Sequence, residues 1–238
     1  ISPAGHQPML SPDGRYAVSY NGEVYNFQEL RAELEPAGFS FKGGSDTEVV
    51  LAACVHWGVE EAVRRFIGMF ALAFWDGENR TMSLVRDRLG IKPLYYGWAG
   101  GDFIFGSESK ALCAHPAFRR ELNRDALALY LKYGYIPAPY SIFRDAACLE
   151  AGSILTLDRR SLESRNPRIE RFWSPLDAVE KGRAHRFAGT PEEAVDELDS
   201  LLRDSIKRRM ISDVPLGAFL SGGIDSSTVV ALMQAQST

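Results

Sequence analysis

Residues 69–85 read Met69-Phe70-Ala71-Leu72-Ala73-Phe74-Trp75-Asp76-Gly77-Glu78-Asn79-Arg80-Thr81-Met82-Ser83-Leu84-Val85. Two apolar segments of strand length enclose a turn sequence at Asp76-Gly77-Glu78-Asn79, which predicts a β-hairpin. A second hairpin is predicted from residues 94–98 and 102–105. Upstream, the β-rich segment 16–20 is followed by Asn21-Gly22, which predicts the end of a strand. Antiparallel strands with helices between them indicate an α+β layered fold.

Two helices are predicted between the first strand and the 69–85 hairpin. The first spans residues 26–34 and stops near Pro36. The second follows Ser45-Asp46-Thr47-Glu48, which matches the S/T-x-x-E capping box and precedes an apolar run to Trp57.

The composition is that of a globular chain. Of 238 residues, 45% are hydrophobic and 24% are charged, which is more apolar than disordered segments are. The formal charge of −4, without a basic run, favours no nucleic-acid partner. No apolar run approaches the roughly 20 residues of a membrane span, so we expect no membrane partner. Three scattered cysteines, Cys54, Cys113 and Cys148, fit no disulfide framework and favour a cytoplasmic protein.

The chain divides into two predicted domains. Residues 1–173 carry the hairpins, residues 174–190 are polar and weakly patterned, which favours a linker, and residues 191–238 begin a second domain. Thr190-Pro191-Glu192-Glu193 is typical of a capped helix start. An apolar strand at 214–220, a glycine-rich turn and a helix from Thr228 then indicate an α/β fold. The chain opens at Ile1 without an initiator Met and closes inside a predicted helix, so we expect a fragment of a longer protein.

The glycine-rich turn is Ser221-Gly222-Gly223-Ile224-Asp225-Ser226-Ser227. Two glycines after a strand allow close backbone approach to a ligand, and the following helix start and the serine hydroxyls suit phosphate oxygens. Asp225 would repel phosphate unless a divalent cation bridges them, which indicates Mg²⁺ with a nucleotide. The alternative is a plain strand-to-helix turn capped by Asp or Ser.

Three further segments carry candidate chemistry. The Asn21 side-chain amide and the Gly22 N–H could together stabilise an oxyanion, and the Glu23 carboxylate could pair with a substrate ammonium group. Spacing alone, however, favours a hairpin turn at Asn21-Gly22. Two interpretations of Asp46 are open: its negative charge stabilises a helix N-terminus, or its carboxylate binds a ligand. The charged stretch 86–95 favours a salt-bridged turn.

Taken in order, these segments resemble the glutamine-hydrolysing asparagine synthetases. The motifs that carry the resemblance are Asn21-Gly22-Glu23-Val24-Tyr25-Asn26, Gly44-Ser45-Asp46-Thr47-Glu48, Gly68-Met69-Phe70-Ala71, Arg86-Asp87-Arg88-Leu89-Gly90-Ile91-Lys92-Pro93-Leu94-Tyr95, Ser107-Glu108-Ser109-Lys110-Ala111-Leu112, Ser212-Asp213-Val214-Pro215 and Ser221 to Ser227. They cover nearly the whole chain. The resemblance therefore makes Asn21-Gly22 and Asp46 candidate site residues rather than a turn and a cap.

The resemblance implies a two-domain enzyme that uses glutamine, aspartate and ATP. An N-terminal-nucleophile hydrolase domain, a four-layer αββα sandwich, would release ammonia from glutamine through an N-terminal cysteine. An α/β domain of the ATP-pyrophosphatase type would adenylate aspartate, and ammonia would displace AMP to give asparagine, with pyrophosphate as the other product. Relatives are commonly homodimers.

The resemblance also implies residue roles. Asn21 and Gly22 would form the oxyanion hole, and Glu23 and Asp46 would hold the α-amino group of glutamine. The ATP-binding residues would be Leu220, Ser221, Gly222, Gly223, Asp225, Ser226 and Ser227, with Asp225 directed toward Mg²⁺.

The chain departs from the family pattern at its start. The family's nucleophilic cysteine is missing, since Ile1 is no nucleophile and none of the three cysteines occupies its position. We therefore expect the chain by itself to catalyse neither half-reaction. Three alternatives stay open: an enzyme that amidates another carboxylate, on a sugar or a peptide, a β-lactam-synthetase-like ligase without glutaminase activity, and a non-enzymatic module.

Overall fold

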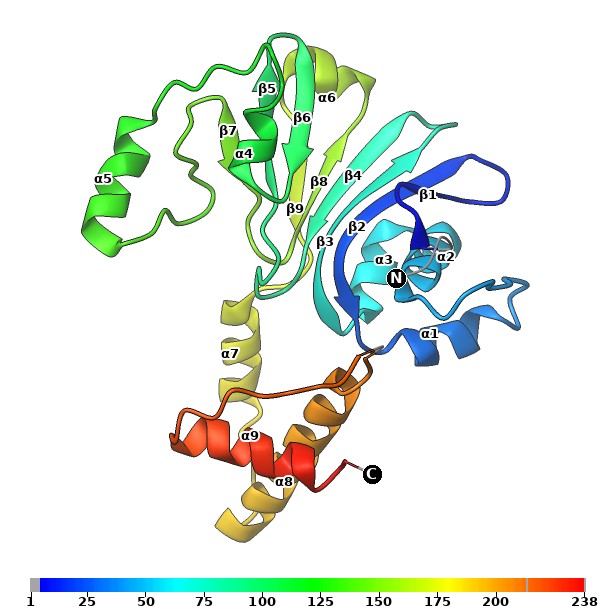
Figure 1. Cartoon of the computed structure of the whole chain (residues 1–238), viewed down its shortest axis with the longest axis vertical. Helices are drawn as coiled ribbons and strands as arrows, with labels where there is room; N and C mark the ends of the chain where they lie inside the picture. The colour runs from blue at the N-terminus through cyan, green and yellow to red at the C-terminus, as the bar shows by residue number, and fades with distance from the viewer. Residues whose placement is uncertain (1–4, 213, 238) are drawn as a thin grey trace. The chain divides into compact units, whose positions relative to one another are not determined.

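The computed structural model describes residues 5–212 and 214–237, which form two compact units divided after Pro175 (Figure 1). The strands of the described residues all lie in the first unit. Within the described part of the chain, no helix is long and apolar enough to cross a membrane.

Two antiparallel sheets form the centre of the first unit. The larger sheet has the order β1-β2-β3-β4-β8-β9 and the smaller one the order β6-β5-β7. The strands are β1 (Met9–Leu10), β2 (Tyr16–Val24), β3 (Gly68–Asp76), β4 (Thr81–Arg86), β5 (Tyr95–Ala99), β6 (Asp102–Gly106), β7 (Ala146–Cys148), β8 (Ser153–Leu157) and β9 (Arg168–Arg171). Both predicted hairpins are confirmed, as β3–β4 and β5–β6.

Helices cover the outer faces of both sheets (Figure 1). The helices of this unit are α1 (Phe27–Leu34), α2 (Asp46–Trp57), α3 (Val59–Arg65), α4 (Ser109–Leu112), α5 (Arg124–Tyr133) and α6 (Arg159–Ser164). The first three pack on the larger sheet, and α4 packs on the smaller one through the buried Leu112. The layers are therefore α-β-β-α, and the predicted sandwich is confirmed.

The central strand β3 is buried on both faces. Phe70, Leu72 and Phe74 belong to the core beneath α1, α2 and α3. Ala71 and Ala73 face the second core, which lies between the two sheets. This double burial explains why residues 69–75 form one continuous apolar run instead of an alternating one.

The predicted strand end at Asn21-Gly22 is wrong. β2 continues to Val24, with Asn21 opposite Ala71 and Gly22 opposite Phe70 in β3. The Asn-Gly pair is common in turns, but here ladder pairing with a buried strand overrides that local preference.

Two local predictions need correction. The Ser45 hydroxyl caps α2 by accepting from the Thr47 N–H, whereas Glu48 accepts from the backbone N–H groups of Lys42 and Gly43, so no reciprocal capping box forms. The turn after β4 is held by backbone contacts: the buried Asp87 carboxylate accepts four backbone N–H bonds, and no ion pair of the described residues includes it. Backbone donors satisfy a buried carboxylate without a second charged partner.

The second unit contains three helices among its described residues, α7 (Pro175–Ala184), α8 (Pro191–Arg209) and α9 (Ile224–Gln234). Thr190 and Glu193 form the predicted capping box of α8. The predicted strand at 214–220 is absent, and Phe219 is fully exposed. A strand requires a ladder partner, and none of the described residues pairs with this segment. The helix after the glycine-rich turn begins at Ile224 instead of Thr228.

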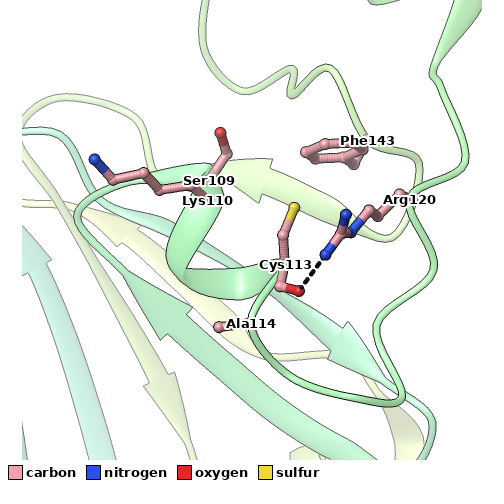
Figure 2. Close-up of a pocket in the computed structure, with 6 residues that line it drawn as sticks. All are labelled: Ser109, Lys110, Cys113, Ala114, Arg120 and Phe143. Carbon is pink, nitrogen blue, oxygen red and sulfur yellow. Dashed lines mark hydrogen bonds between the residues drawn. The ribbon is translucent and has the colours of Figure 1, made fainter.

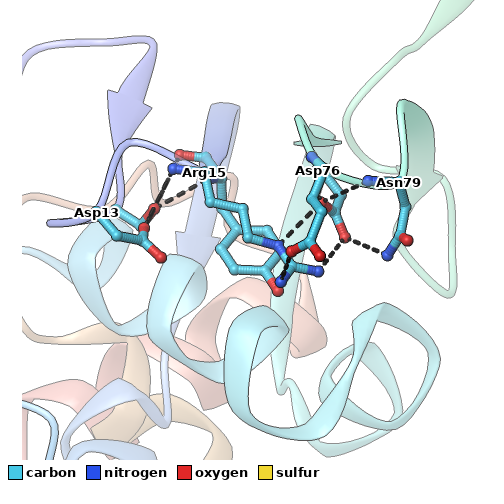
Figure 3. A network of polar contacts seen from close by, with 7 residues as sticks. Asp13, Arg15, Asp76 and Asn79 are labelled. Carbon is cyan, nitrogen blue, oxygen red and sulfur yellow. Dashed lines mark hydrogen bonds and ion pairs between the residues drawn. The ribbon is translucent and has the colours of Figure 1, made fainter.

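A polar network closes the β3–β4 hairpin (Figure 3). The Asp76 carboxylate accepts from Arg15 Nε at 3.1 Å and from Asn79 Nδ2 at 2.7 Å. It also accepts from the backbone N–H groups of Glu78 and Asn79. These donors favour the charged carboxylate, so the pKa of Asp76 lies below its usual range, with Arg15 as the largest cause.

We expect Asp76→Asn to lower the stability of the protein at neutral pH. Because the folded pKa of Asp76 is depressed, its contribution is present above the unfolded value of about 3.9 and is lost as the pH falls below it. Urea midpoints at neutral and acidic pH measure this, with the exposed Asp125→Asn as control. A gap between wild type and Asp76→Asn that stays constant at every pH contradicts the assignment.

Candidate functional site

The four residues predicted to contact glutamine come from two elements that meet at the end of β2. Asn21, Gly22 and Glu23 are consecutive in β2, and Asp46 is the first residue of α2. Asp46 Oδ2 accepts from the Val24 N–H at 3.0 Å. The helix start is thereby tied directly to the strand end.

Tyr20 reinforces this connection from the core side. Its hydroxyl donates to Asp46 Oδ2 at 2.7 Å, and its side chain is buried. Burial raises the pKa of Tyr20, and the nearby Asp46 carboxylate raises it further. The phenol therefore stays protonated and remains a donor to Asp46.

Gly22 occupies a position that has no room for a side chain. A Cβ there would lie 2.6 Å from Phe70 Cα and still closer to the Met69 carbonyl oxygen. Gly68, opposite Val24, has no room for a side chain either, because an added Cβ would lie 2.9 Å from Val24 Cα. The two strands can approach this closely only because both positions are glycine.

The Gly22 N–H points away from β3. Phe70, opposite Gly22, uses both of its backbone groups on Asp87: its N–H donates to the Asp87 carboxylate and its C=O accepts from the Asp87 N–H. Gly22 and Phe70 are thus a non-hydrogen-bonded pair. In antiparallel sheets the Cα atoms of such pairs lie closer together than those of hydrogen-bonded pairs.

The neighbouring N–H groups support this direction. The Tyr20 N–H donates to the Gln7 side chain at 2.6 Å and the Val24 N–H to Asp46, both on the edge of β2 opposite β3. The Gly22 N–H lies between them, beyond the β1 pairing, which ends at Val18. Among residues 5–212 and 214–237 it has no acceptor, so on this edge it can donate to a ligand.

The Asn21 side chain reaches toward the smaller sheet. Its Nδ2 donates to Ser107 Oγ at 3.0 Å, across a separation of 86 residues. Both residues line a cavity of about 210 Å³ between the sheets, together with Ser19, Tyr20, Ala71, Leu72, Ala73, Leu94, Phe105 and Gly106. An amide donor at this cavity and a backbone donor on the next residue, Gly22, suit an oxyanion.

None of the three cysteines lines this cavity. Cys54 is fully buried in the core, which raises its pKa to about 12, and burial also raises the pKa of Cys148. Cys113 lies instead at a separate cavity of about 440 Å³ with Ser109, Lys110, Ala114, Arg120 and Phe143 (Figure 2). There Arg120 donates to the Cys113 backbone carbonyl at 3.1 Å. None of these thiols is placed to attack a ligand beside Asn21.

The predicted ATP loop is ordered by its own serines. The Ser221 and Ser226 hydroxyl oxygens are 2.8 Å apart, and Ser226 also donates to the Gly223 carbonyl at 3.1 Å. Gly222 has a φ of +80°, which favours glycine. Leu220 and the loop up to Asp225 are exposed, and Asp225 stands in the first turn of α9.

Sequence reasoning missed two residues of this region, Tyr20 and Ser107. The sequence pattern predicts only a strand position for Tyr20. Because residues two apart in a strand share a face, Tyr20 lies on the same side as Val18, which is the core side. Ser107 belongs to one of the motifs quoted above, but nothing in the sequence indicates a contact with Asn21 from a different sheet.

We expect Gly22→Ala to destabilise the protein by about 3 kcal/mol or more, because the new methyl group meets backbone atoms that cannot rotate away. Gly101→Ala is the matched control: no atom lies within 4 Å of its Cβ position, so its effect should stay within about 0.5 kcal/mol. Denaturant unfolding followed by circular dichroism measures both. Equal stability of the two variants would contradict the close approach of β2 and β3.

Curated relatives cover almost all of this chain. A putative glutamine-hydrolysing asparagine synthetase 2 of Methanocaldococcus jannaschii is 38% identical over 98% of the chain and 46% of its own length. Asparagine synthetase 3 of Bacillus subtilis is 36% identical over 96% of the chain and 36% of its own length. The chain therefore spans less than half the length of these relatives. Among solved structures, the glutamine phosphoribosylpyrophosphate amidotransferase of B. subtilis aligns with 70% of this chain and 31% of its own chain at 21% identity, with a TM-score of 0.47.

Two family models match the chain in sequence. The glutamine amidotransferase domain model matches residues 1–173, which include Asn21, Gly22, Glu23 and Asp46. The asparagine synthase model matches residues 197–238, which include the glycine-rich loop. By the match over residues 1–173, this chain belongs to the glutamine amidotransferase domain family.

Proposed function

We propose that this chain is part of a glutamine-hydrolysing asparagine synthetase. In this proposal residues 1–173 release ammonia from glutamine, residues 174–190 connect the domains and residues 191–238 begin the ATP-dependent domain. The complete enzyme would amidate aspartate through an aspartyl-adenylate, with AMP and pyrophosphate as the other products. The order of the two family matches and the names of the relatives support it.

The pair of donors at Asn21 and Gly22 is the observation that carries the glutaminase assignment. When a nucleophile attacks the side-chain carbonyl of glutamine, the carbonyl oxygen becomes an oxyanion. The outward Gly22 N–H and the Asn21 amide at the cavity would donate to that oxygen. One such donor contributes roughly 10²–10³ to the rate. The nucleophile would be the N-terminal cysteine of the family, because none of Cys54, Cys113 and Cys148 lines this cavity.

Glu23 and Asp46 would hold the α-ammonium group of glutamine. Asp46 is fixed through Oδ2 by two donors, while among the described residues its Oδ1 receives only the Thr47 hydroxyl, at 3.5 Å. A carboxylate offers about four lone-pair directions, so Asp46 can position an ammonium while it anchors β2.

The loop from Leu220 to Ser227 would bind the phosphates of ATP. Its hydroxyls and the N-terminus of α9 are donors, which fits an anion, and Asp225 is the carboxylate that could hold Mg²⁺. The ion would neutralise phosphate charge. Gly222 leaves open space beside the backbone for a ligand, since a Cβ there would meet no atom within 4 Å.

The alternatives are less well supported. The relatives named above are asparagine synthetases, which favours aspartate over a sugar or peptide carboxylate. The geometry at Asn21 and Gly22 favours a working glutaminase over a β-lactam-synthetase-like ligase or a non-enzymatic module. The complete enzyme would be cytoplasmic and would form a homodimer.

We expect Asn21→Ala in the complete protein to lower glutamine-dependent asparagine formation by about 10²- to 10³-fold, because it removes one oxyanion donor. Synthesis with ammonium salts in place of glutamine should be unchanged, since that reaction bypasses the amidotransferase site. Asparagine formation from each nitrogen source measures both. Equal loss with glutamine and with ammonia would count against the oxyanion role.

We expect Asp225→Asn to lower the ATP-dependent reaction by about 10- to 100-fold, through loss of a charged ligand to Mg²⁺. Glutamine hydrolysis should persist. The exposed Asp196→Asn in α8 is the matched control. Release of AMP at varied Mg²⁺ concentration measures the effect, and a Mg²⁺ dependence identical to that of wild type would remove Asp225 from the proposed site.

A further inference from the structure

Ser107 connects the smaller sheet to the candidate oxyanion hole. It follows the last residue of β6, and its hydroxyl oxygen accepts from Asn21 Nδ2 at 3.0 Å. Among residues 5–212 and 214–237, this is the only hydrogen bond of the Asn21 side chain. The orientation of this amide therefore depends on one partner, which comes from the opposite sheet.

Ser107 is itself held firmly in place. Gly106 precedes it, and a Cβ at that position would lie 3.1 Å from the Ala111 side chain, so α4 packs closely on the end of β6. Leu112 of α4 is 1% exposed and anchors the helix in the core beneath it. The Ala111 N–H donates to the Glu108 carbonyl at 3.0 Å and closes the turn directly after Ser107.

The contact holds the Asn21 side chain with its amide nitrogen toward Ser107. A primary amide has two N–H donors on nitrogen, and exchange of its oxygen and nitrogen would present a carbonyl where an oxyanion requires a donor. With one N–H bound to Ser107, the carbonyl oxygen is directed elsewhere and the second N–H remains for a ligand. The hydroxyl thus keeps a donor at the cavity that Asn21 and Ser107 both line.

We propose that Ser107 is a positioning residue for glutamine hydrolysis, which acts through the Asn21 amide by orienting it toward the oxyanion. This inference rests on the proposed function. Because the oxyanion exists only in the transition state, loss of Ser107 should act on kcat and spare the KM for glutamine.

The test uses the complete protein and compares Ser107→Ala with Asn21→Ala and with the double variant. Ser107→Ala should lower kcat for glutamine hydrolysis about tenfold, the effect of one lost hydrogen bond, with KM changed less than about twofold. The double variant should be no slower than Asn21→Ala alone, because Ser107 acts only through Asn21. Ammonia-dependent synthesis should be unchanged.

Two further variants separate positioning from a general loss of structure. Ser107→Thr keeps the hydroxyl and should recover most of the lost kcat. Ser109→Ala removes a nearby hydroxyl at the start of α4 and should behave as wild type. Thermal unfolding of Ser107→Ala should match that of Ser109→Ala, so that a slower enzyme cannot be attributed to unfolding.

The results also separate this inference from the proposed function. If Asn21→Ala slows glutamine hydrolysis and Ser107→Ala does not, or if the two effects multiply in the double variant, the positioning role is overturned while the proposed function stands. If Asn21→Ala itself leaves glutamine hydrolysis unchanged, the proposed function fails first, and the role of Ser107 fails with it.

Discussion

The close approach of β2 and β3 at Gly22 and Gly68 is the constraint on which the site depends. Each glycine faces the backbone of the opposite strand with no room for a methyl group. The pair at Gly22 and Phe70 is a non-hydrogen-bonded one, because Phe70 directs its backbone groups to Asp87. As a result the Gly22 N–H leaves the sheet on the opposite edge, and Asn21 extends toward the second sheet.

Buried or half-buried carboxylates hold the backbone around this point. Asp87 accepts N–H bonds from Phe70, Leu89, Ile91 and Lys92, and so fixes β3 and the loop after β4. Asp46 connects the end of β2 to the start of α2 by accepting from the Val24 N–H and the Tyr20 hydroxyl. A carboxylate surrounded by backbone donors stabilises irregular chain segments that lack a ladder. The motifs of the chain thus contribute to its geometry as well as to its candidate chemistry.

Much of the amidotransferase fold could be predicted from the sequence, because its signals are local. The 69–85 hairpin, the Thr190 helix cap and the layered arrangement follow from apolar runs and turn residues. The extension of β2 through Asn21-Gly22 could not be predicted, since it depends on pairing with a strand 48 positions away, at Phe70↔Gly22. The strand expected at 214–220 was wrong because apolar character alone does not supply a hydrogen-bonding partner.

The candidate site was predictable in its residue types and only partly in its geometry. Resemblance selected Asn21, Gly22 and Asp46, but the Tyr20 and Ser107 contacts join segments distant in sequence, and no local pattern encodes them. The same resemblance selected Ser221 to Ser227, whose hydroxyls are arranged within a single loop. Long-range contacts, unlike local ones, become visible only in the folded chain.

Asn21 and Gly22 are proposed to donate together to a negatively charged oxygen. A crystal structure of the complete protein with a covalent glutamine-derived inhibitor that forms a tetrahedral adduct would locate that oxygen. We expect the adduct oxygen at about 2.7–3.1 Å from both Asn21 Nδ2 and the Gly22 nitrogen. An adduct oxygen that contacts neither group, or a Gly22 N–H that donates to another strand, would contradict this proposal.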